Sequence, residues 1–123
     1  MAEGFLNQYI KGEYAVFSAG IETHGLNQMA VKAMKEVEID ISHHRSNHVD
    51  EFAHVVFDYV ITVCDHAREN CPYFLAKKSN LHHNFPDPAL AKGTHGERMN
   101  AFRSCRNEID AYCKNFSEEI NKN

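Results

Sequence analysis

The sequence predicts an α/β fold in which helices cover a small parallel sheet, giving three layers. Two observations carry this prediction. The run "VVFDYVITVC" (residues 55–64) is almost continuously apolar and rich in β-branched residues, which is typical of a strand buried on both faces of a parallel sheet. Helical periodicity occurs on both sides of this run, so helices and strands alternate along the chain.

The first predicted helix occupies the first ten residues. One of its faces is apolar at helical spacing and carries Phe5, Leu6, Tyr9 and Ile10. No residue precedes Met1 to cap it. Because parallel sheets are built by crossovers that run from strand to helix to strand, a unit that begins with a helix is expected to lack its first strand.

The remaining elements follow in alternation. "YAVFSAG" (residues 14–20) is typical of a short strand closed by glycine, and residues 27–37 form a helical pattern. After the central run, a short strand at residues 80–84 leads to the turn "FPDPA". The inward stripe of the 27–37 helix is Met29, Ala30, Ala33, Met34 and Val37, and that of a long C-terminal helix is Phe102, Cys105, Ile109, Tyr112, Phe116 and Ile120.

Composition indicates one domain over residues 1–123, since 43% apolar and 24% charged residues suffice for a single core. The net charge of −4 and the lack of a basic run argue against nucleic acid and membrane partners. The sequence shows neither a signal-peptide pattern nor an apolar stretch of about 18 residues, so we expect a cytoplasmic protein. In that reducing compartment the four cysteines favour packed thiols, metal ligands or redox groups over structural disulfides: Cys64, Cys71, Cys105 and Cys113.

Two of these cysteines lie close together in the sequence. Cys64 ends the central apolar run, and open parallel sheets bind ligands beyond the carboxyl ends of their strands. Cys71 follows after "DHAREN". From the residues alone, Cys64 is either a functional thiol or a small buried hydrophobe, and Cys71 either its partner or an incidental loop thiol. Between them, His66 and Arg68 can lower the pKa of a nearby thiol, whereas Asp65 and Glu69 act the other way. The direction of any shift in the thiol pKa therefore stays open.

Several ordered stretches carry a family resemblance. They are "MAEGF", "SAGIETHGLN", "AVKAMKEVEIDIS", "FDYVITVCDHARENCP", "FPDPA" and "FRSCRNEI". From Met1 to about Ile109 the chain resembles the thioredoxin-coupled arsenate reductases, which have the low-molecular-weight tyrosine phosphatase fold. The most specific part is "VITVC" followed seven residues later by "CP".

The resemblance implies a relay of cysteines. In the family, a first cysteine in an anion-binding loop attacks arsenate. A second, matching Cys64, attacks the covalent adduct and releases arsenite, and a third, matching Cys71, takes over the disulfide and presents it to thioredoxin. Asp87 in "FPDPA" matches the acid that protonates the departing oxygen. Its alternative role is that of a turn residue before Pro88.

The chain departs from the family in one respect. The family's nucleophile lies in a Cys-x5-Arg loop between a first strand and the helix that here begins "MAEGF", and these 123 residues contain no such motif. The expectation is a start codon assigned too late or an N-terminal deletion, with about 15 to 20 further residues encoded upstream as a strand and loop. As given, the chain would then carry only the relay half, and we expect it to be inactive.

Nine histidines raise the question of a metal site. Structural zinc sites favour cysteines spaced C-x2–4-C, and the C-x6-C spacing of Cys64 and Cys71 departs from that, so we predict no metal and no cofactor. Only one of His82 and His83 can face the core from a strand. Cys105 and Cys113 are expected to be core thiols.

Two other functions stay open at this point. One is a non-catalytic binding protein of the same fold, possibly a homo-oligomer, because a sheet without its first strand exposes strand edges that another copy can pair with. The other is a phosphatase, which is less favoured because it requires the same missing loop and has no use for the relay cysteines.

Overall fold

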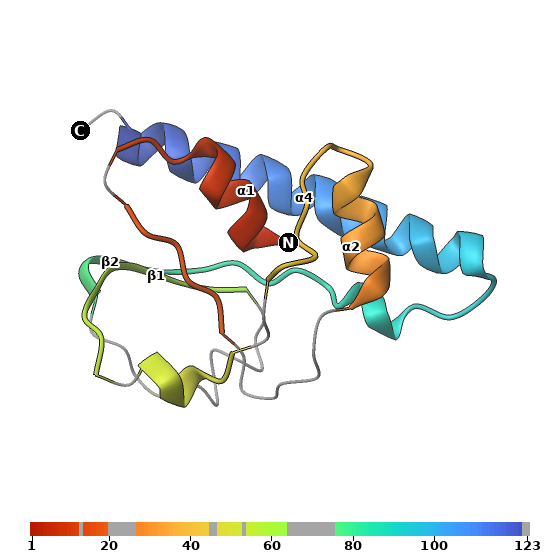
Figure 1. Cartoon of the computed structure of the whole chain (residues 1–123), viewed down its shortest axis with the longest axis horizontal. Helices are drawn as coiled ribbons and strands as arrows, with labels where there is room; N and C mark the ends of the chain where they lie inside the picture. The colour runs from red at the N-terminus through yellow and green to blue at the C-terminus, as the bar shows by residue number, and fades with distance from the viewer. Residues whose placement is uncertain (13, 20–26, 45–46, 53, 64–75, 122–123) are drawn as a thin grey trace. The chain divides into compact units, whose positions relative to one another are not determined.

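The computed structural model describes residues 1–121 except residues 13, 20–26, 45–46, 53 and 64–75 (Figure 1). It contains the helices α1 (Ala2–Tyr9), α2 (Gln28–Lys35) and α4 (His95–Asn121) and the strands β1 (Phe57–Thr62) and β2 (Ala76–His82). Short 3-10 helices are η1 (Val49–Phe52) and η2 (Pro88–Leu90). Within these described residues, no helix is long and apolar enough to span a membrane.

The chain divides into two compact units. The helical unit comprises Met1–Ser18, Leu26–Arg45 and Asp87–Asn123, and the sheet unit comprises Ala19–Gly25 and Ser46–Pro86. The helical unit therefore contains α1, α2, η2 and α4, and the sheet unit contains η1 and both strands.

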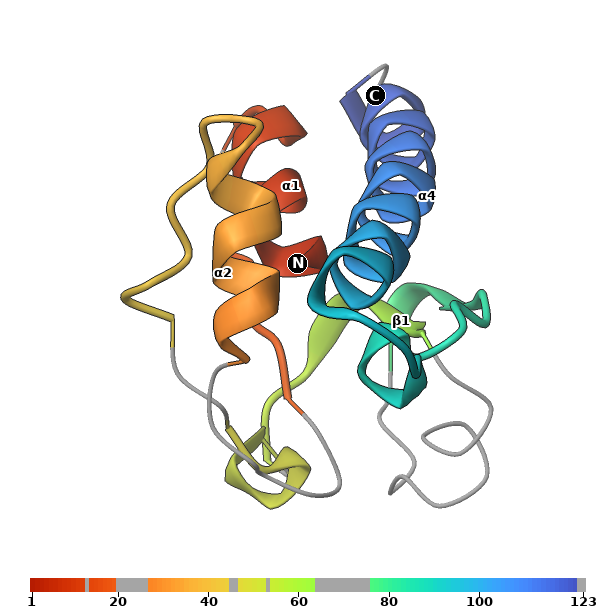
Figure 2. The ribbon, with the colours of Figure 1, turned by 90° about the vertical axis from the view of Figure 1, so that its right-hand side faces the viewer.

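In the helical unit, α1 and α2 both pack on α4 (Figure 2). The predicted apolar stripe of α4 is confirmed, except that Tyr112 is only half-buried. The buried side of α4 consists of Met99, Phe102, Cys105, Arg106, Ile109, Cys113, Phe116, Ser117 and Ile120. Its partners in the core include Phe5 of α1 and Ala33 and Met34 of α2.

Gly4 of α1 lies against core side chains from later in the chain. A Cβ atom at this position would lie 3.0 Å from Ile41 Cγ2 and 3.2 Å from Met34 Cε. The glycine in "MAEGF" therefore leaves room in the core for the side chains of Met34 and Ile41.

The predicted helix at residues 27–37 is confirmed with shorter bounds. Asn27 caps α2, since its Oδ1 accepts hydrogen bonds from Met29 N at 2.8 Å and Ala30 N at 3.3 Å. The helix ends at Lys35, and the expected inward residue Val37 is 39% exposed because it lies beyond the last turn.

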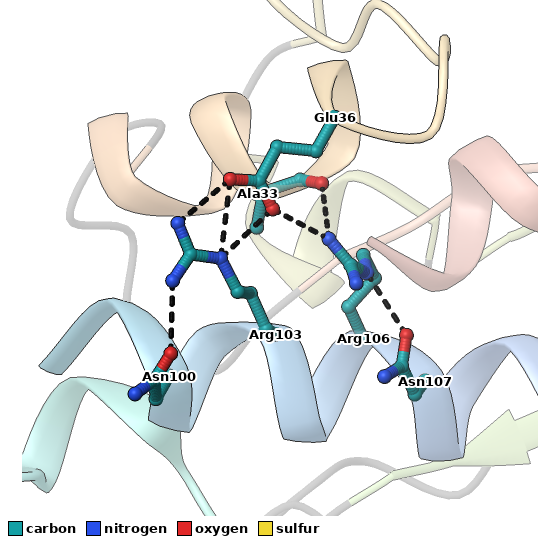
Figure 3. A network of polar contacts seen from close by, with 6 residues as sticks. All are labelled: Ala33, Glu36, Asn100, Arg103, Arg106 and Asn107. Carbon is teal, nitrogen blue, oxygen red and sulfur yellow. Dashed lines mark hydrogen bonds and ion pairs between the residues drawn. The ribbon is translucent and has the colours of Figure 1, made fainter. Parts of the chain in front are cut away.

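A polar network joins α2 to α4 within the otherwise apolar contact (Figure 3). Arg106 is buried and donates hydrogen bonds to Ala33 O at 3.0 Å and to Glu36 at 2.8 Å. Arg103 donates to the same carboxylate at 2.8 Å. Ala33 O belongs to the last turn of α2. The carbonyl groups of a last turn have no partner N–H within their own helix, because no further turn follows. Arg106 of α4 supplies the missing donor and so acts as a C-terminal cap for α2.

This network changes the ionisation of Glu36. The hydrogen bond from Arg103, supported by that from Arg106, lowers the pKa of Glu36 from 4.5 to about 2, although desolvation opposes the shift. Because the folded pKa is depressed, the stabilisation is fully present above pH 4.5 and is lost as the pH falls through about 2.

In the sheet unit, β1 and β2 form a parallel pair, as the sequence predicts. Their register pairs Phe57 with Ala76 and Thr62 with His82, with an irregularity between Phe57 and Tyr59. The strand predicted at residues 80–84 in fact runs from Ala76 to His82, because backbone pairing with β1 sets its limits.

Two other strand predictions need correction. The central strand is two residues shorter at each end than predicted, and its residues are half-buried rather than fully buried on both faces. Val55 and Val56 precede the ladder and are 42% and 53% exposed. Residues 14–19 form no strand, since an extended run becomes one only by pairing with a neighbour, and the described ladder joins β1 to β2.

The start of α4 supports a first prediction. Thr94 accepts a hydrogen bond from Glu97 N at 3.1 Å and donates to Glu97 Oε1 at 3.3 Å, which satisfies one of the unpaired N–H groups at the helix start. Thr94→Ala should lower the free energy of unfolding by about 1 kcal/mol, measured by urea denaturation. Thr94→Ser keeps the hydroxyl and should lose much less. Equal midpoints for the native chain and Thr94→Ala would show that this cap contributes nothing.

Candidate functional site

The structure describes one of the three predicted catalytic residues. Cys64 and Cys71 lie outside the described residues, so their roles stay predictions. Asp87 is described, and it is the first residue of the helical unit after the sheet unit.

Asp87 is an exposed turn residue at the start of η2. Its Oδ1 accepts a hydrogen bond from Ala89 N at 2.9 Å, so the role as a turn residue before Pro88 is confirmed. This does not exclude the catalytic role. The catalytic role of Asp87 stays a prediction.

Asp87 is connected to α4 through η2. The 3-10 helix that Asp87 starts packs on α4. Burial raises the pKa of the Cys105 thiol on α4, and the charges of Glu108 and Asp87 add to this effect while the amino group of Met1 opposes it.

The N-terminal end of α1 is half-buried. Burial lowers the pKa of the Met1 amino group, and the charge of Glu3 opposes the shift. The Glu3 carboxylate forms an ion pair with His44 Nδ1 at 2.8 Å. The N-terminal end of a helix attracts anions.

Cys105 and Cys113 are packed thiols, as predicted. They are 7% and 2% exposed, and the Cys113 thiol approaches Ala2 O at 3.9 Å. Burial raises the pKa of Cys113 to about 12, so this thiol is protonated at neutral pH. Eight residues of helix separate the two Cα atoms by about 12 Å, beyond the roughly 7 Å that a disulfide spans.

A further polar pair lies at the carboxyl ends of the two strands. Thr62 Oγ1 lies 2.6 Å from His82 Nδ1, and it also donates to Leu81 O at 3.4 Å. His82 is half-buried and His83 is exposed, which confirms that only one of the two faces inward. Sequence reasoning missed the pair, because only the register that sets Thr62 opposite His82 brings the side chains together.

Two further histidines pair with carboxylates. Besides the pair of His44 and Glu3, His48 Nδ1 lies 3.3 Å from Asp50. Within the residues that the structure describes, no three histidine, cysteine or acidic side chains are grouped as metal ligands would be.

Comparison with known proteins identifies the family. The family model for low molecular weight phosphotyrosine protein phosphatases matches residues 1–123. The chain belongs to this family. The α/β fold predicted from the sequence is thereby confirmed as a low-molecular-weight phosphotyrosine phosphatase-like fold, with a small parallel sheet and helices.

Within the phosphatase family, this member is similar to arsenate reductases. It is 46% identical over 118 residues to the arsenate reductase of Halalkalibacterium halodurans, covering 96% of this chain and 85% of that protein. The arsenate reductase of Bacillus subtilis gives the same identity and the same coverage, 46% over 118 residues. The resemblance stated from the sequence motifs is confirmed.

Solved structures agree with these relatives. An arsenate reductase in its oxidised state matches this phosphatase-family chain with a TM-score of 0.79 and 28% identity, covering 97% of this chain and 86% of that one. An arsenate reductase in a phosphate-binding state matches with a TM-score of 0.78 and 29% identity, with the same coverage.

Proposed function

We propose that this chain carries the acid and relay residues of an arsenate reductase-type oxidoreductase, a cytoplasmic enzyme that reduces arsenate to arsenite with thioredoxin as the reductant. The observation that carries this proposal is the 46% identity to arsenate reductases over 96% of the chain.

The first step is the attack of a nucleophilic cysteine thiolate on arsenate. A bond forms between sulfur and arsenic, one arsenic–oxygen bond breaks, and Asp87 gives its proton to the departing oxygen, which leaves as water. General-acid catalysis requires a carboxyl group within about 3 Å of that oxygen. An exposed turn position is suited to this task.

The second step is the relay. The Cys64 thiolate attacks the sulfur of the nucleophile, the sulfur–arsenic bond breaks, and its electron pair reduces arsenic, which leaves as arsenite. Cys71 then attacks Cys64 and frees the nucleophile, and the dithiol of thioredoxin reduces the Cys64–Cys71 disulfide. Such a relay moves the disulfide from a closed anion site to a surface that thioredoxin can reach.

The nucleophile and its arginine are absent from these 123 residues, since none of the four cysteines has an arginine six positions later. The part of the mechanism that this chain carries is therefore the acid and the relay. The homo-oligomer, in which exposed strand edges of the sheet pair with a second copy of this chain, also stays a prediction.

The relay can be tested by itself. Under mild oxidation Cys64 and Cys71 should form an intramolecular disulfide, because closing a short loop costs only a few kcal/mol of chain entropy. Thioredoxin should reduce this bond more readily than a structural disulfide, since relay sulfurs are accessible. Peptide mapping by mass spectrometry before and after reduction measures both properties.

Cys71→Ser is the matched control and should abolish the fast-forming disulfide. The buried Cys105 and Cys113 serve as internal controls that should stay reduced, because helix geometry keeps them apart. A Cys64 that remains a thiol under conditions that oxidise exposed dithiols would rule out the relay.

A further inference from the structure

The end of α1 is joined to α4 by three side chains. These are Tyr9, Asp110 and Asn121, and together they are called the α1 clasp. The Tyr9 hydroxyl donates a hydrogen bond to Asp110 Oδ1. Both helices belong to the helical unit, where α1 lies against α4 (Figure 1). The clasp therefore connects positions about 100 residues apart in the sequence.

Asn121, in the last turn of α4, holds the backbone at the end of α1. Its Nδ2 donates to Tyr9 O at 3.1 Å, and its Oδ1 accepts from Lys11 N at 3.1 Å. Tyr9 O is one of the carbonyl groups that a last turn leaves without a partner in its own helix. Between the two backbone groups, Ile10 is extended, with φ −74° and ψ 129°. One primary amide thus satisfies a backbone acceptor and a backbone donor together.

α1 depends on such contacts because it is short. It has eight residues, and isolated helices shorter than roughly 12 residues are marginal in water. The contact of α2 with α4 has its own polar network, which runs through Glu36, Arg103 and Arg106 (Figure 3). Loss of the clasp should therefore weaken the hold on α1 and leave α2 in place.

Cys113 of α4 lies under α1 and reports whether α1 is in place. Its Sγ is 3.9 Å from Ala2 O, and the side chain is buried. Burial raises the pKa of this thiol to about 12, so with α1 in place the thiol is both covered and protonated at neutral pH. A reagent that reacts with thiolates can modify Cys113 only after α1 has moved away.

We propose that α1 is a detachable cover of the helical unit, which opens from α4 while α2 stays folded on α4, and that the α1 clasp sets how rarely it opens. Opening exposes Phe5 of α1 and the Cys113 thiol of α4. Contiguous elements of a protein can open in this way at a lower free energy than global unfolding. The inference is independent of the proposed function, because opening involves neither arsenate nor the relay cysteines.

The test follows α1 and Cys113 in the native chain. Pulse labelling with iodoacetamide and peptide mapping give the labelling rate of Cys113, and hydrogen exchange with mass spectrometry gives the exchange rates of the α1 and α2 amides. We expect the α1 amides to exchange faster than the α2 amides. Low urea concentrations should barely change the labelling rate of Cys113, since the urea dependence of an opening scales with the surface that it exposes.

Two variants weaken the clasp. Tyr9→Phe removes the hydroxyl and keeps the ring that stacks on Phe5, with 6.2 Å between the ring centroids. It should raise the labelling rate of Cys113 and the exchange of α1 about tenfold, because a hydrogen bond to a charged group is lost. Asn121→Ala should raise both rates about threefold, since its hydrogen bonds are neutral and exposed. The exchange of α2 should not change in either variant.

Asn115→Ala is the matched control, an asparagine replaced at an exposed position of α4, and should leave both rates at their native values. A native labelling rate of Cys113 in folded Tyr9→Phe overturns the role of the clasp, as does a rise in Asn115→Ala equal to that in Asn121→Ala. Equal exchange of α1 and α2 in the native chain, with a steep urea dependence for Cys113, rejects the separate opening of α1. This last comparison requires no variant, so it decides the proposal even where a variant fails to fold.

Discussion

Purified residues 1–123 should reduce arsenate at no measurable rate, even with thioredoxin present. The covalent step requires a thiolate nucleophile held in an oxyanion cradle, and removing a nucleophile of this kind typically lowers turnover by roughly 10⁴ to 10⁶. No cysteine of the chain has the Cys-x5-Arg spacing. Cys105 and Cys113 are no substitutes, since burial raises the pKa of both thiols.

The assay follows arsenite formation, or the oxidation of NADPH through thioredoxin reductase and thioredoxin. The arsenate reductase of Bacillus subtilis, at 46% identity, is a suitable positive control. The same preparation should also fail to hydrolyse an aryl phosphate, since phosphoryl transfer by this fold needs the same cradle. Turnover comparable to the control would overturn our placement of the nucleophile and require a different thiol in that role.

Arg106→Met should lower the free energy of unfolding by about 2 to 4 kcal/mol. Methionine fills a similar volume but cannot donate hydrogen bonds. The change leaves Ala33 O in the last turn of α2 without the donor at 3.0 Å and removes one of the two arginines from Glu36. An unsatisfied carbonyl in a buried contact costs its full desolvation, which makes the loss large for a single hydrogen-bonding side chain.

Arg103→Met is the matched control for this prediction. Arg103 binds the same carboxylate, but its side chain is 39% exposed, against 11% for Arg106, and the described bonds of its guanidinium reach side chains only. Exposed ion pairs contribute little, so this variant should lose less than about 1 kcal/mol. Urea unfolding of both variants at neutral pH provides the comparison. Equal losses would mean that the cap on Ala33 O is not the source of the effect.

The helices were predictable from the sequence because their signals are local. The periodicity of residues 102–120 identified the buried side of α4, and that of residues 27–37 located α2. The motifs around Cys64, Cys71 and Asp87 were sufficient to recognise the family, which the match over residues 1–123 confirms. These features depend on residues close together in the chain.

The strands and the polar contacts depended on partners distant in the sequence. Residues 14–19 have a strand-like pattern but form no strand, and β2 begins four residues earlier than its pattern indicates, because pairing rather than composition defines a strand. Arg106 lies in an apolar stripe where periodicity predicts a hydrophobic residue. It is tolerated there because Ala33 O and Glu36, about 70 positions away, satisfy its charge and donors.

The sequence by itself thus determined the family, the helical pattern and the residues to which the proposed chemistry is assigned. Only the tertiary structure decided that Asp87 caps the turn of η2, that Cys105 and Cys113 are buried and too far apart to pair, and that Thr62 meets His82. The physical reason is that burial, charge environment and hydrogen-bond partners are properties of the three-dimensional neighbourhood, which local sequence patterns do not contain.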